Sequence, residues 1–149
     1  MTMSEVCTRD VVIVSKDSPI IEAAKLMRDF HVGNVVVIEG SDTGNIPVGI
    51  LTDRDIVVEL IPNIADLSSV TVDDVMSFNL ITAHETDGVM ETVKRMRHEG
   101  IRRIPVVDDN KALVGIFTMD DMINLIAEQQ MDLAGLINRE QQQEKRLRI

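Results

Sequence analysis

Aromatic residues are almost absent from this sequence, which has three phenylalanines and neither tryptophan nor tyrosine among its 149 residues. Any core must therefore be aliphatic, and a hydrophobic content of 44%, including nine adaptable methionines, is enough to build one. Cysteine is nearly absent too: the single Cys7 cannot form a disulfide within the chain, and no basic and apolar leader opens the sequence. These absences favour a globular protein of a reducing, cytoplasmic compartment.

Positive charge is scarce, because 15 lysines and arginines stand against 25 aspartates and glutamates, for a formal net charge of −10. A chain without an overall positive field is not expected to bind nucleic acid or anionic lipid. Long apolar runs are missing as well, and none approaches the roughly 20 residues that span a bilayer. The sequence thus predicts a soluble protein with neither a nucleic-acid nor a membrane partner.

Metal-binding and catalytic patterns are also missing. His31, His84 and His98 have no ligand spacing with Cys7, so no metal site is predicted. No nucleophile, base and orienting group can be assembled from the motifs, and the chain is not expected to be an enzyme.

What the sequence does contain is an internal repeat. Met27-Arg28 returns as Met96-Arg97, 69 positions later, and apolar residues coincide along that shift. Farther on, segment 48–55 (VGILTDRD) matches segment 114–121 (VGIFTMDD), 66 positions later. The shift changes by three residues at a surface hairpin, where the turn-rich loop 40–45 is longer than its counterpart 109–111.

Each copy has the pattern of a β-α-β-β-α unit. Short runs rich in β-branched residues predict strands, and apolar residues three and four apart predict a helix with one buried face. In the first copy these are strand 11–14, a helix with the stripe Ile20, Ala23, Ala24, Met27 and Phe30, strand 35–38, a strand ending at Leu51, and a helix from about Asp53 to Pro62. In the second they are strand 80–82, a helix with the stripe Val89, Val93, Met96 and Gly100, strand 104–107, a strand ending at Phe117, and a helix from about Met119.

These units divide the chain into four segments. We expect the first repeat at 6–62, a linker at 63–74, the second repeat at 75–130 and a polar, helical tail at 131–149.

The last helix has a second feature of its own. Apolar residues continue into the tail at heptad-like spacings, which makes this helix a candidate for pairing with another chain. Gly135 weakens that prediction. The residues are Met122, Ile126, Leu133 and Leu136, with Gln129 in the intervening position.

A Thr-x-x-Asp motif stands at the last strand-to-helix junction of each copy, as Thr52/Asp55 and Thr118/Asp121. One interpretation is a helix cap, in which threonine and acid bond to the exposed helix amides. The other is a ligand site, since a carboxylate there can accept both hydroxyls of a ribose. The repetition of the motif behind Gly-Ile and an apolar residue makes coincidence less credible but does not exclude paired caps.

At these residues the chain resembles the CBS domain family, named after cystathionine β-synthase. The resemblance runs from about Val6 to Gln130 and rests on the repeated helices with Met, the Pro-Val-Val-Asp strand at 105–108, and Val-Gly-Ile-apolar-Thr-x-x-Asp. Two tandem copies resemble a Bateman module. The resemblance implies a mixed α/β (α+β) fold of tandem β-α-β-β-α repeats, packed as a pseudo-twofold pair with two clefts for adenosine-containing ligands.

The resemblance also implies roles for particular residues. Ribose hydroxyls would bind Thr52 and Asp55 in one cleft and Thr118 and Asp121 in the other. Phosphate would bind Arg102 and Arg103, and the alternative for these two residues is a solvated pair after a helix. The adenine would lie among Met76, Ile81 and Ile101 in the Asp55 cleft, and among Cys7, Val12 and Val32 in the Asp121 cleft, with Ile116 also assigned to the adenine pocket.

The two clefts are not expected to be equivalent. The first copy has Gly33 and Asn34 where the second has the two arginines, so the cleft with Thr118 and Asp121 is favoured. The resemblance places these arginines near the pseudo-twofold axis, where they could also bind a phosphate from the other cleft.

The expected function is regulatory. The module would sense AMP, the preferred candidate, or ADP, ATP, NAD or S-adenosylmethionine, dimerise through the exposed helices of the pair, and signal to an unknown effector protein in trans. The alternative is a structural or interaction module in which the Thr-x-x-Asp motifs only cap helices and bind no nucleotide.

Overall fold

The computed structural model describes residues 1–63 and 66–148. Positions 64 and 65 of the expected linker and position 149 of the expected tail lie outside the described residues. The chain divides into two units, Met1–Phe117 and Thr118–Ile149, and each is described by itself.

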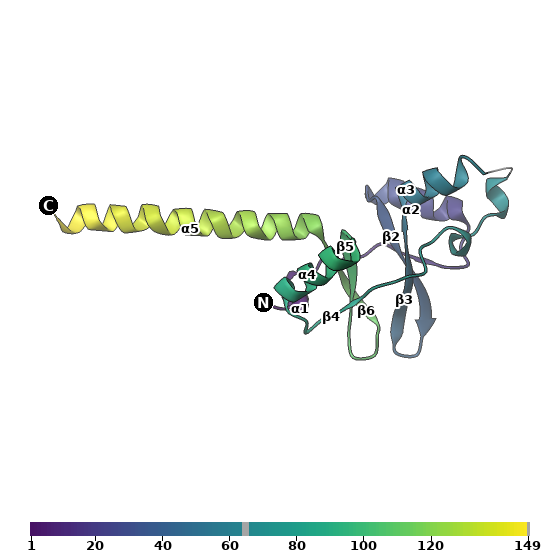
Figure 1. Cartoon of the computed structure of the whole chain (residues 1–149), viewed down its shortest axis with the longest axis horizontal. Helices are drawn as coiled ribbons and strands as arrows, with labels where there is room; N and C mark the ends of the chain where they lie inside the picture. Colours follow the sequence, from purple (N-terminus) through teal and green to yellow (C-terminus); the bar gives the residue numbers. More distant parts are fainter. Residues whose placement is uncertain (64–65, 149) are drawn as a thin grey trace. The chain divides into compact units, whose positions relative to one another are not determined.

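The first unit contains two three-stranded sheets, one from each repeat (Figure 1). In the first sheet β1 (Ile13–Ser15) runs parallel to β2 (Asn34–Ser41), which runs antiparallel to β3 (Gly44–Thr52). In the second, β4 (Ala83–His84) runs parallel to β5 (Arg103–Val107), and β6 (Leu113–Thr118) borders β5. The middle strands are the apolar runs predicted to be buried, and Val35, Val36 and Val37 have no exposed surface.

Two amphipathic helices, α2 (Ile20–Phe30) and α4 (Val89–Glu99), occupy corresponding places in the repeats. Each ends at a residue in the left-handed conformation, His31 (φ 54°) and Gly100 (φ 68°). The predicted stripes are correct at Ile20, Ala23 and Met27 and at Val89 and Met96, which are buried.

Both predicted stripes contain errors. In the first stripe Ala24 is exposed and Phe30, at its end, is 60% exposed, and Gly100 at the end of the second stripe is exposed as well. In the second helix Thr92, and not Val93, is fully buried, because its hydroxyl donates a 2.8 Å hydrogen bond to the carbonyl oxygen of Gly88. A buried hydroxyl that is satisfied within its own helix costs little, so a polar residue fits the apolar face.

The first strand of each repeat begins later than predicted. The prediction of a strand at 80–82 is wrong, since β4 covers only Ala83 and His84. The segment before β4 bonds instead to the first repeat. The amide of Ser77 donates to the carbonyl oxygen of Ile50 at 3.1 Å, and the two residues form an isolated bridge. Residues before β4 therefore cross to the first repeat's sheet before joining their own.

The same crossing occurs at the start of the chain. Thr8 and Ile116 form an isolated bridge, with two hydrogen bonds of 2.9 Å between their backbones. Each crossing passes over a glycine: an added Cβ at Gly115 would lie 2.9 Å from the carbonyl oxygen of Thr8, and one at Gly49 would lie 2.7 Å from that of Ser77. The repeated Val-Gly-Ile motif is thus required by the close approach of a crossing backbone.

The turns that precede these crossings also contact the opposite repeat, and we call them exchanged turns. Helix α1 (Met3–Val6) bonds to the second repeat, with the amide of Met3 2.9 Å from the carbonyl oxygen of Asp87. The 3-10 turns η2 (Leu67–Ser69) and η3 (Val72–Asp74) lie in the expected linker, and Val72 is fully buried in the core cluster that includes Val14 and Leu51. Val72, from the segment that precedes the second repeat, therefore completes the hydrophobic core of the first repeat.

The final helix of the first repeat is short. It consists of α3 (Asp53–Asp55) and the π-helical turn η1 (Ile56–Leu60), and it ends before Pro62, as predicted.

The second unit is one helix, α5 (Met119–Leu147), which continues through Gly135 without a break. None of its residues is buried. No helix in the described parts of the chain is both long enough and apolar enough to span a membrane.

Candidate functional site

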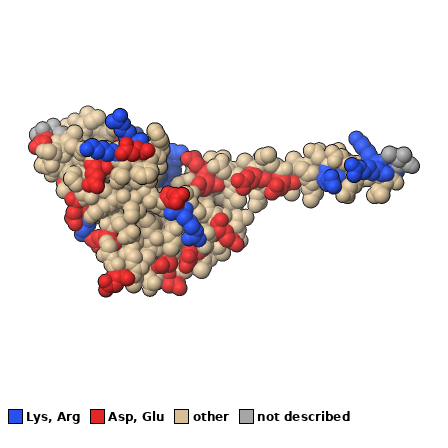
Figure 2. Space-filling view, turned by 180° about the vertical axis from the view of Figure 1, so that it is seen from behind, with Lys and Arg blue, Asp and Glu red and all other residues tan. Residues whose placement is uncertain are grey.

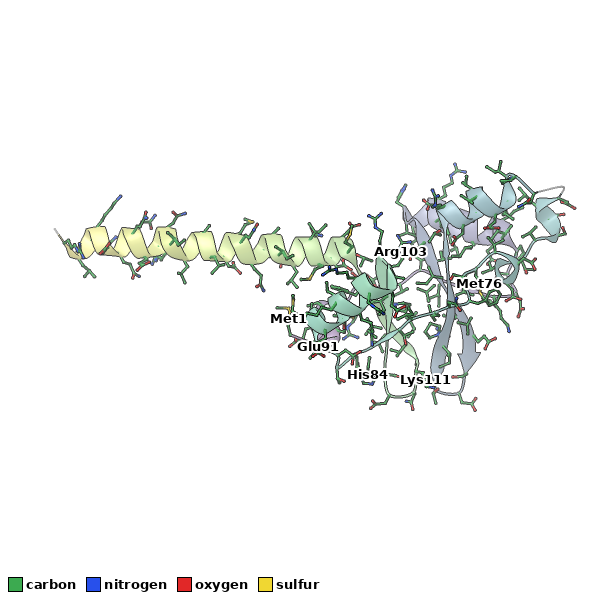
Figure 3. The ribbon with its side chains drawn as sticks, viewed as in Figure 1. Met1, Met76, His84, Glu91, Arg103 and Lys111 are labelled. Atoms are coloured by element: carbon green, nitrogen blue, oxygen red, sulfur yellow. The ribbon has the colours of Figure 1, made fainter. Side chains whose placement is uncertain are left out.

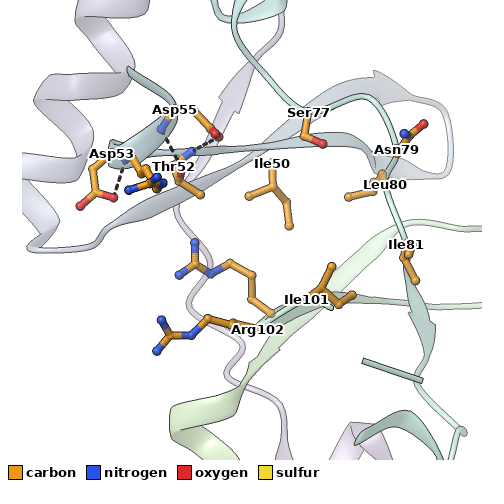
Figure 4. Close-up of a pocket in the computed structure, with 12 residues that line it drawn as sticks. Ile50, Thr52, Asp53, Asp55, Ser77, Asn79, Leu80, Ile81, Ile101 and Arg102 are labelled. Carbon is orange, nitrogen blue, oxygen red and sulfur yellow. Dashed lines mark hydrogen bonds between the residues drawn. The ribbon is translucent and has the colours of Figure 1, made fainter. Parts of the chain in front are cut away.

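A pocket of about 520 Å³ lies in the first unit between the two repeats (Figure 4). Its walls come from the end of β3, the start of α3, the segment that crosses between the sheets, and the start of β5. The residues that line it are Ile50, Thr52, Asp53, Arg54, Asp55, Ser77, Asn79, Leu80, Ile81, Ile101, Arg102 and Arg103.

Thr52 and Asp55 form a reciprocal cap at the edge of this pocket. The amide of Thr52 donates to Asp55 Oδ2 at 2.9 Å, and the amide of Asp55 donates to Thr52 Oγ1 at 3.0 Å. The capping interpretation is therefore correct. It leaves capacity for a ligand, because Asp55 Oδ1 accepts no hydrogen bond from the described residues and the hydroxyl hydrogen of Thr52 remains free to donate.

The structure shows that the motif by itself does not define a ligand site. Thr118 and Asp121 make the same box at the start of α5, with distances of 2.8 and 3.1 Å. Thr71 and Asp74 make a third at η3, where the amide of Thr71 lies 2.9 Å from Asp74 Oδ2. Neither Thr71 nor Asp74 lines the pocket described above. What distinguishes Thr52 and Asp55 from this third pair is the pocket beside them.

Three arginines supply the pocket's positive charge. They are Arg54, Arg102 and Arg103, of which the last two were expected at a phosphate. Together with Asp53 and Asp55 they give the lining a formal charge of +1, in a chain whose net charge is −10. A pocket that is positively charged in an otherwise negatively charged chain favours an anionic group of a ligand.

Arg103, which is labelled in Figure 3, has a buried donor that lacks an acceptor within the described structure. Its Nε is buried and finds no hydrogen-bond partner among the described residues. Most buried polar atoms in proteins are hydrogen-bonded, and an unbonded guanidinium N–H is costly. An acceptor supplied by a ligand would remove that cost.

A second hollow, of about 700 Å³, lies at the hairpin end of the repeats, lined in part by His84 and Lys111. Polar side chains there pair with one another: His84 Nε2 lies 2.8 Å from Asp109 Oδ1, and Arg95 lies 3.5 Å from Asp87. Unlike the first pocket, it contains no buried polar atom that lacks a partner within the described structure.

The structure brings together most of the residues assigned to the Asp55 cleft. Ile81 and Ile101 line the pocket with the ribose and phosphate candidates, whereas Met76 does not. Met76 is buried in the first repeat's core, with Sδ 2.9 Å from the position of a Cβ on Gly49. The arginines that were expected to favour the Asp121 cleft lie in the pocket with Asp55.

Sequence reasoning assigned no role in the site to six lining residues: Ile50, Asp53 and Arg54 beside the Thr-x-x-Asp motif, and Ser77, Asn79 and Leu80. The last three belong to the crossing segment, which was interpreted in part as a strand. The sequence does contain one relevant pattern. The residues that precede this segment resemble residues 2–8, and that similarity indicates an equivalent crossing, here over Gly49.

The second expected cleft is only partly described. Cys7, Val12, Val32 and Ile116 belong to the first unit, whereas Thr118 and Asp121 belong to the second. Within the first unit, Cys7 Sγ lies 2.6 Å from the position of a Cβ on Gly115, and Ile116 is buried. A ligand site made from these residues stays a prediction.

Comparison with known proteins identifies the family. The CBS domain model matches residues 3–61 and 72–128, so the chain belongs to the CBS domain family and contains two copies of the domain. This confirms the resemblance and the mixed α/β fold of tandem repeats. Both matches begin within the exchanged turns, α1 and η3, and not at the first strands.

The similar proteins include both small and large chains. MK0525 of Methanopyrus kandleri is 38% identical over 125 residues, which cover 84% of this chain and 62% of that protein. Homoserine O-acetyltransferase of Methanosalsum zhilinae is 30% identical over 126 residues, which cover only 24% of the enzyme. The chain therefore spans less than two thirds of these relatives.

Among solved structures, the CBS domain pair of MJ0100 superimposes with a TM-score of 0.74 at 28% identity. The match covers 87% of this chain and 98% of that one. The MJ0100 pair was solved in complex with 5′-methylthioadenosine and S-adenosylmethionine. A protein of Pyrococcus horikoshii, 30% identical, matches over 83% of this chain with a TM-score of 0.70.

Proposed function

We propose that this chain is a regulatory module that binds an adenosine-containing ligand in the pocket lined by Thr52 and Asp55. The observation that carries the proposal is the buried Nε of Arg103, which has no hydrogen-bond partner in the described parts of the chain, in the same pocket as the Asp55 carboxylate, whose Oδ1 accepts no hydrogen bond from them. A nucleotide has complementary groups, because its phosphate accepts and its ribose hydroxyls donate.

The parts of the ligand have separate places in this proposal. Asp55 Oδ1 and the Thr52 hydroxyl bind the ribose, and the three arginines bind phosphate. Apolar side chains of Ile50, Leu80, Ile81 and Ile101 flank the adenine, while backbone groups and polar side chains of the crossing segment bind its edge. The complex of the MJ0100 pair with two adenosine compounds supports this ligand class.

The charge of the pocket separates the candidate ligands. Three arginines favour AMP, ADP, ATP or NAD over 5′-methylthioadenosine, which has no anionic group, and AMP is the preferred ligand. Neither a nucleophile with an adjacent base nor a bound cofactor is part of the proposal, and the function is regulatory and not catalytic.

Calorimetric titration with AMP, ADP, ATP, NAD, S-adenosylmethionine and adenosine tests the proposal. Asp55→Ala should weaken binding about ten- to a hundredfold, because hydrogen bonds to charged groups contribute roughly 1.5–3 kcal/mol. Asp74→Ala is the matched control, since it breaks the same capping box outside the pocket. No heat with any ligand at millimolar concentration would refute the proposal.

A second comparison tests the phosphate subsite. Arg103→Ala should weaken AMP and ATP far more than adenosine, whereas Arg97→Ala, on the exposed face of α4, should change neither. Equal losses for nucleotide and nucleoside would contradict the role of Arg103.

The capping boxes support the alternative of a structural or interaction module without a nucleotide. The box formed by Thr71 and Asp74 shows that such a motif exists here without lining the pocket. If Asp55→Ala and Asp74→Ala lower stability equally and neither variant affects titration, this second function is the correct one.

The proposal extends to partners and location. We place the module in the cytoplasm, as a homodimer that signals to an effector protein in trans. The ligand acts by binding one arrangement of the assembly more tightly than another, which shifts the population between them.

A further inference from the structure

The pocket between the repeats contains a second carboxylate, which has no part in the proposed binding of the ribose. Asp53 lines the pocket together with the three arginines, yet it forms no ion pair in the described parts of the chain. Its Oδ1 accepts a 2.8 Å hydrogen bond from the amide of Arg54, and its Oδ2 accepts none from the described residues. Asp53 therefore adds a formal negative charge to a pocket whose arginines favour an anion.

Gly33 leaves the space that this carboxylate occupies. A Cβ at position 33 would lie 3.3 Å from Asp53 Oδ2, and its three nearest atoms all belong to the Asp53 carboxyl group. The φ of Gly33 is not positive, so its backbone conformation does not require glycine. The amide of Asp53 also donates a 3.0 Å hydrogen bond to the carbonyl oxygen of Gly33, which holds the two residues side by side. A side chain at position 33 would thus be placed against the carboxylate.

The second repeat has different residues at the corresponding two positions. Arg102 corresponds to Gly33 by the shift of 69 positions, and Met119 corresponds to Asp53 by the shift of 66. The first repeat therefore has a small residue and an acid where the second has a large cation and an apolar residue. Because a long side chain at position 33 would contact Asp53, the glycine and the carboxylate form a matched pair.

The place of Asp53 in the pocket relates it to the phosphate of the proposed ligand. Figure 4 shows Asp53 and the guanidinium of Arg102 at the left of the pocket, and Leu80 and Ile81, which are assigned to the adenine, at the right. Thr52, the neighbour of Asp53 in sequence, is assigned to the ribose. A phosphate chain that extends from the ribose toward the arginines therefore also approaches Asp53.

The charges of the lining limit the number of phosphates that the pocket favours. Its formal charge is +1, and a monophosphate carries about −2. Each further phosphoryl group adds about one negative charge, which the lining does not balance. Acidic side chains are also scattered over the face of the first unit that Figure 2 shows, so the surface there does not attract a further anionic group. Like charges repel at short range, and Asp53 is the carboxylate on the phosphate side.

We propose that Asp53, in the space left by Gly33, restricts the phosphate subsite to one phosphate and so selects AMP over ADP and ATP. Its role is repulsive, because it disfavours a longer phosphate chain and supplies no bond to AMP. This inference rests on the proposed function, since it names the residue that determines the specificity of the same site.

Calorimetric titration of the full chain with AMP and with ATP, in the presence of EDTA, tests this role. Asp53→Asn keeps the Oδ1 acceptor for the amide of Arg54 but removes the charge. It should lower the ratio of the ATP to the AMP dissociation constant about fivefold, which is the order of interactions between exposed charges. The effect should shrink when sodium chloride is raised from about 0.05 to about 0.5 M, because salt screens exposed charges.

Two variants are the controls. Asp42→Asn removes the same charge from the exposed turn between β2 and β3, outside the pocket, and should leave the ratio unchanged. Asp53→Glu retains the charge in the pocket and should keep the ratio of the parent chain.

The outcomes separate this inference from the proposed function. An unchanged ratio in Asp53→Asn, with AMP still bound, would overturn the role of Asp53 and leave the proposed function standing. A higher ratio would overturn it as well, since Asp53 would then help to bind the longer nucleotide. If the parent chain binds no nucleotide, the proposed function and this inference both fail.

Discussion

The close approach at Gly49 leads to a definite prediction about stability. An alanine Cβ there would lie 2.7 Å from the carbonyl oxygen of Ser77 and 2.9 Å from Met76 Sδ, both below the 3.0 Å that ordinary Cβ contacts respect. Met76 can adjust its side chain, but the carbonyl belongs to a backbone held by the bridge between Ile50 and Ser77. The crossing segment must therefore move away from β3.

Overpacking of this kind costs about 1–3 kcal/mol, so we expect Gly49→Ala to lower the free energy of unfolding by about 2 kcal/mol. In a chain of this size that change lowers the midpoint of thermal unfolding by about 4–8 °C. Gly40→Ala is the control, because no atom lies within 4 Å of its Cβ position, and it should stay within about 0.5 kcal/mol of the parent. Equal calorimetric midpoints for the two variants would refute the explanation of the Val-Gly-Ile motif.

Two further substitutions probe the buried parts of the repeats. Thr92→Val keeps the shape of the side chain but removes the 2.8 Å hydrogen bond to Gly88, and it should cost about 1 kcal/mol in a urea titration; an unchanged midpoint would contradict this role. Val36→Ala opens space at a fully buried position of β2 and should cost about 2–3 kcal/mol by the same measurement, while a loss below about 0.5 kcal/mol would show that the sheet closes around it.

The repeat and its main elements were predictable because their signals are long and periodic. The eleven-residue helices show spacings of three and four, and the central strands are continuous apolar runs. The shift of 69 positions also relates residues 2–5 to 71–74, and the structure shows one capping box in each segment, at Thr2/Glu5 and Thr71/Asp74. The sequence analysis missed that relation, because the two four-residue segments share only the threonine and an acidic residue.

The candidate pocket was predictable only in part, for a related reason. Thr52, Asp55, Arg102 and Arg103 follow recognisable motifs, and the structure places them in one pocket. Asn79 and Leu80 follow no motif. Their position depends on the bridge at Ser77, which is a contact between residues 27 positions apart and leaves no periodic pattern in either segment.

The exchanged turns explain how a ligand in this pocket can affect the whole first unit. The segment that forms one pocket wall continues from η3, whose Val72 completes the core of the first repeat, and leads into β4 of the second repeat. Arg102 and Arg103 stand at the start of β5, which pairs with β4. In the proposed complex, a nucleotide bound to the carboxylate of Asp55 on the first repeat and to these arginines on the second would therefore join elements of both repeats. Because its binding free energy would depend on the spacing of the two repeats, it would stabilise one spacing over others, which is the physical requirement for a sensor.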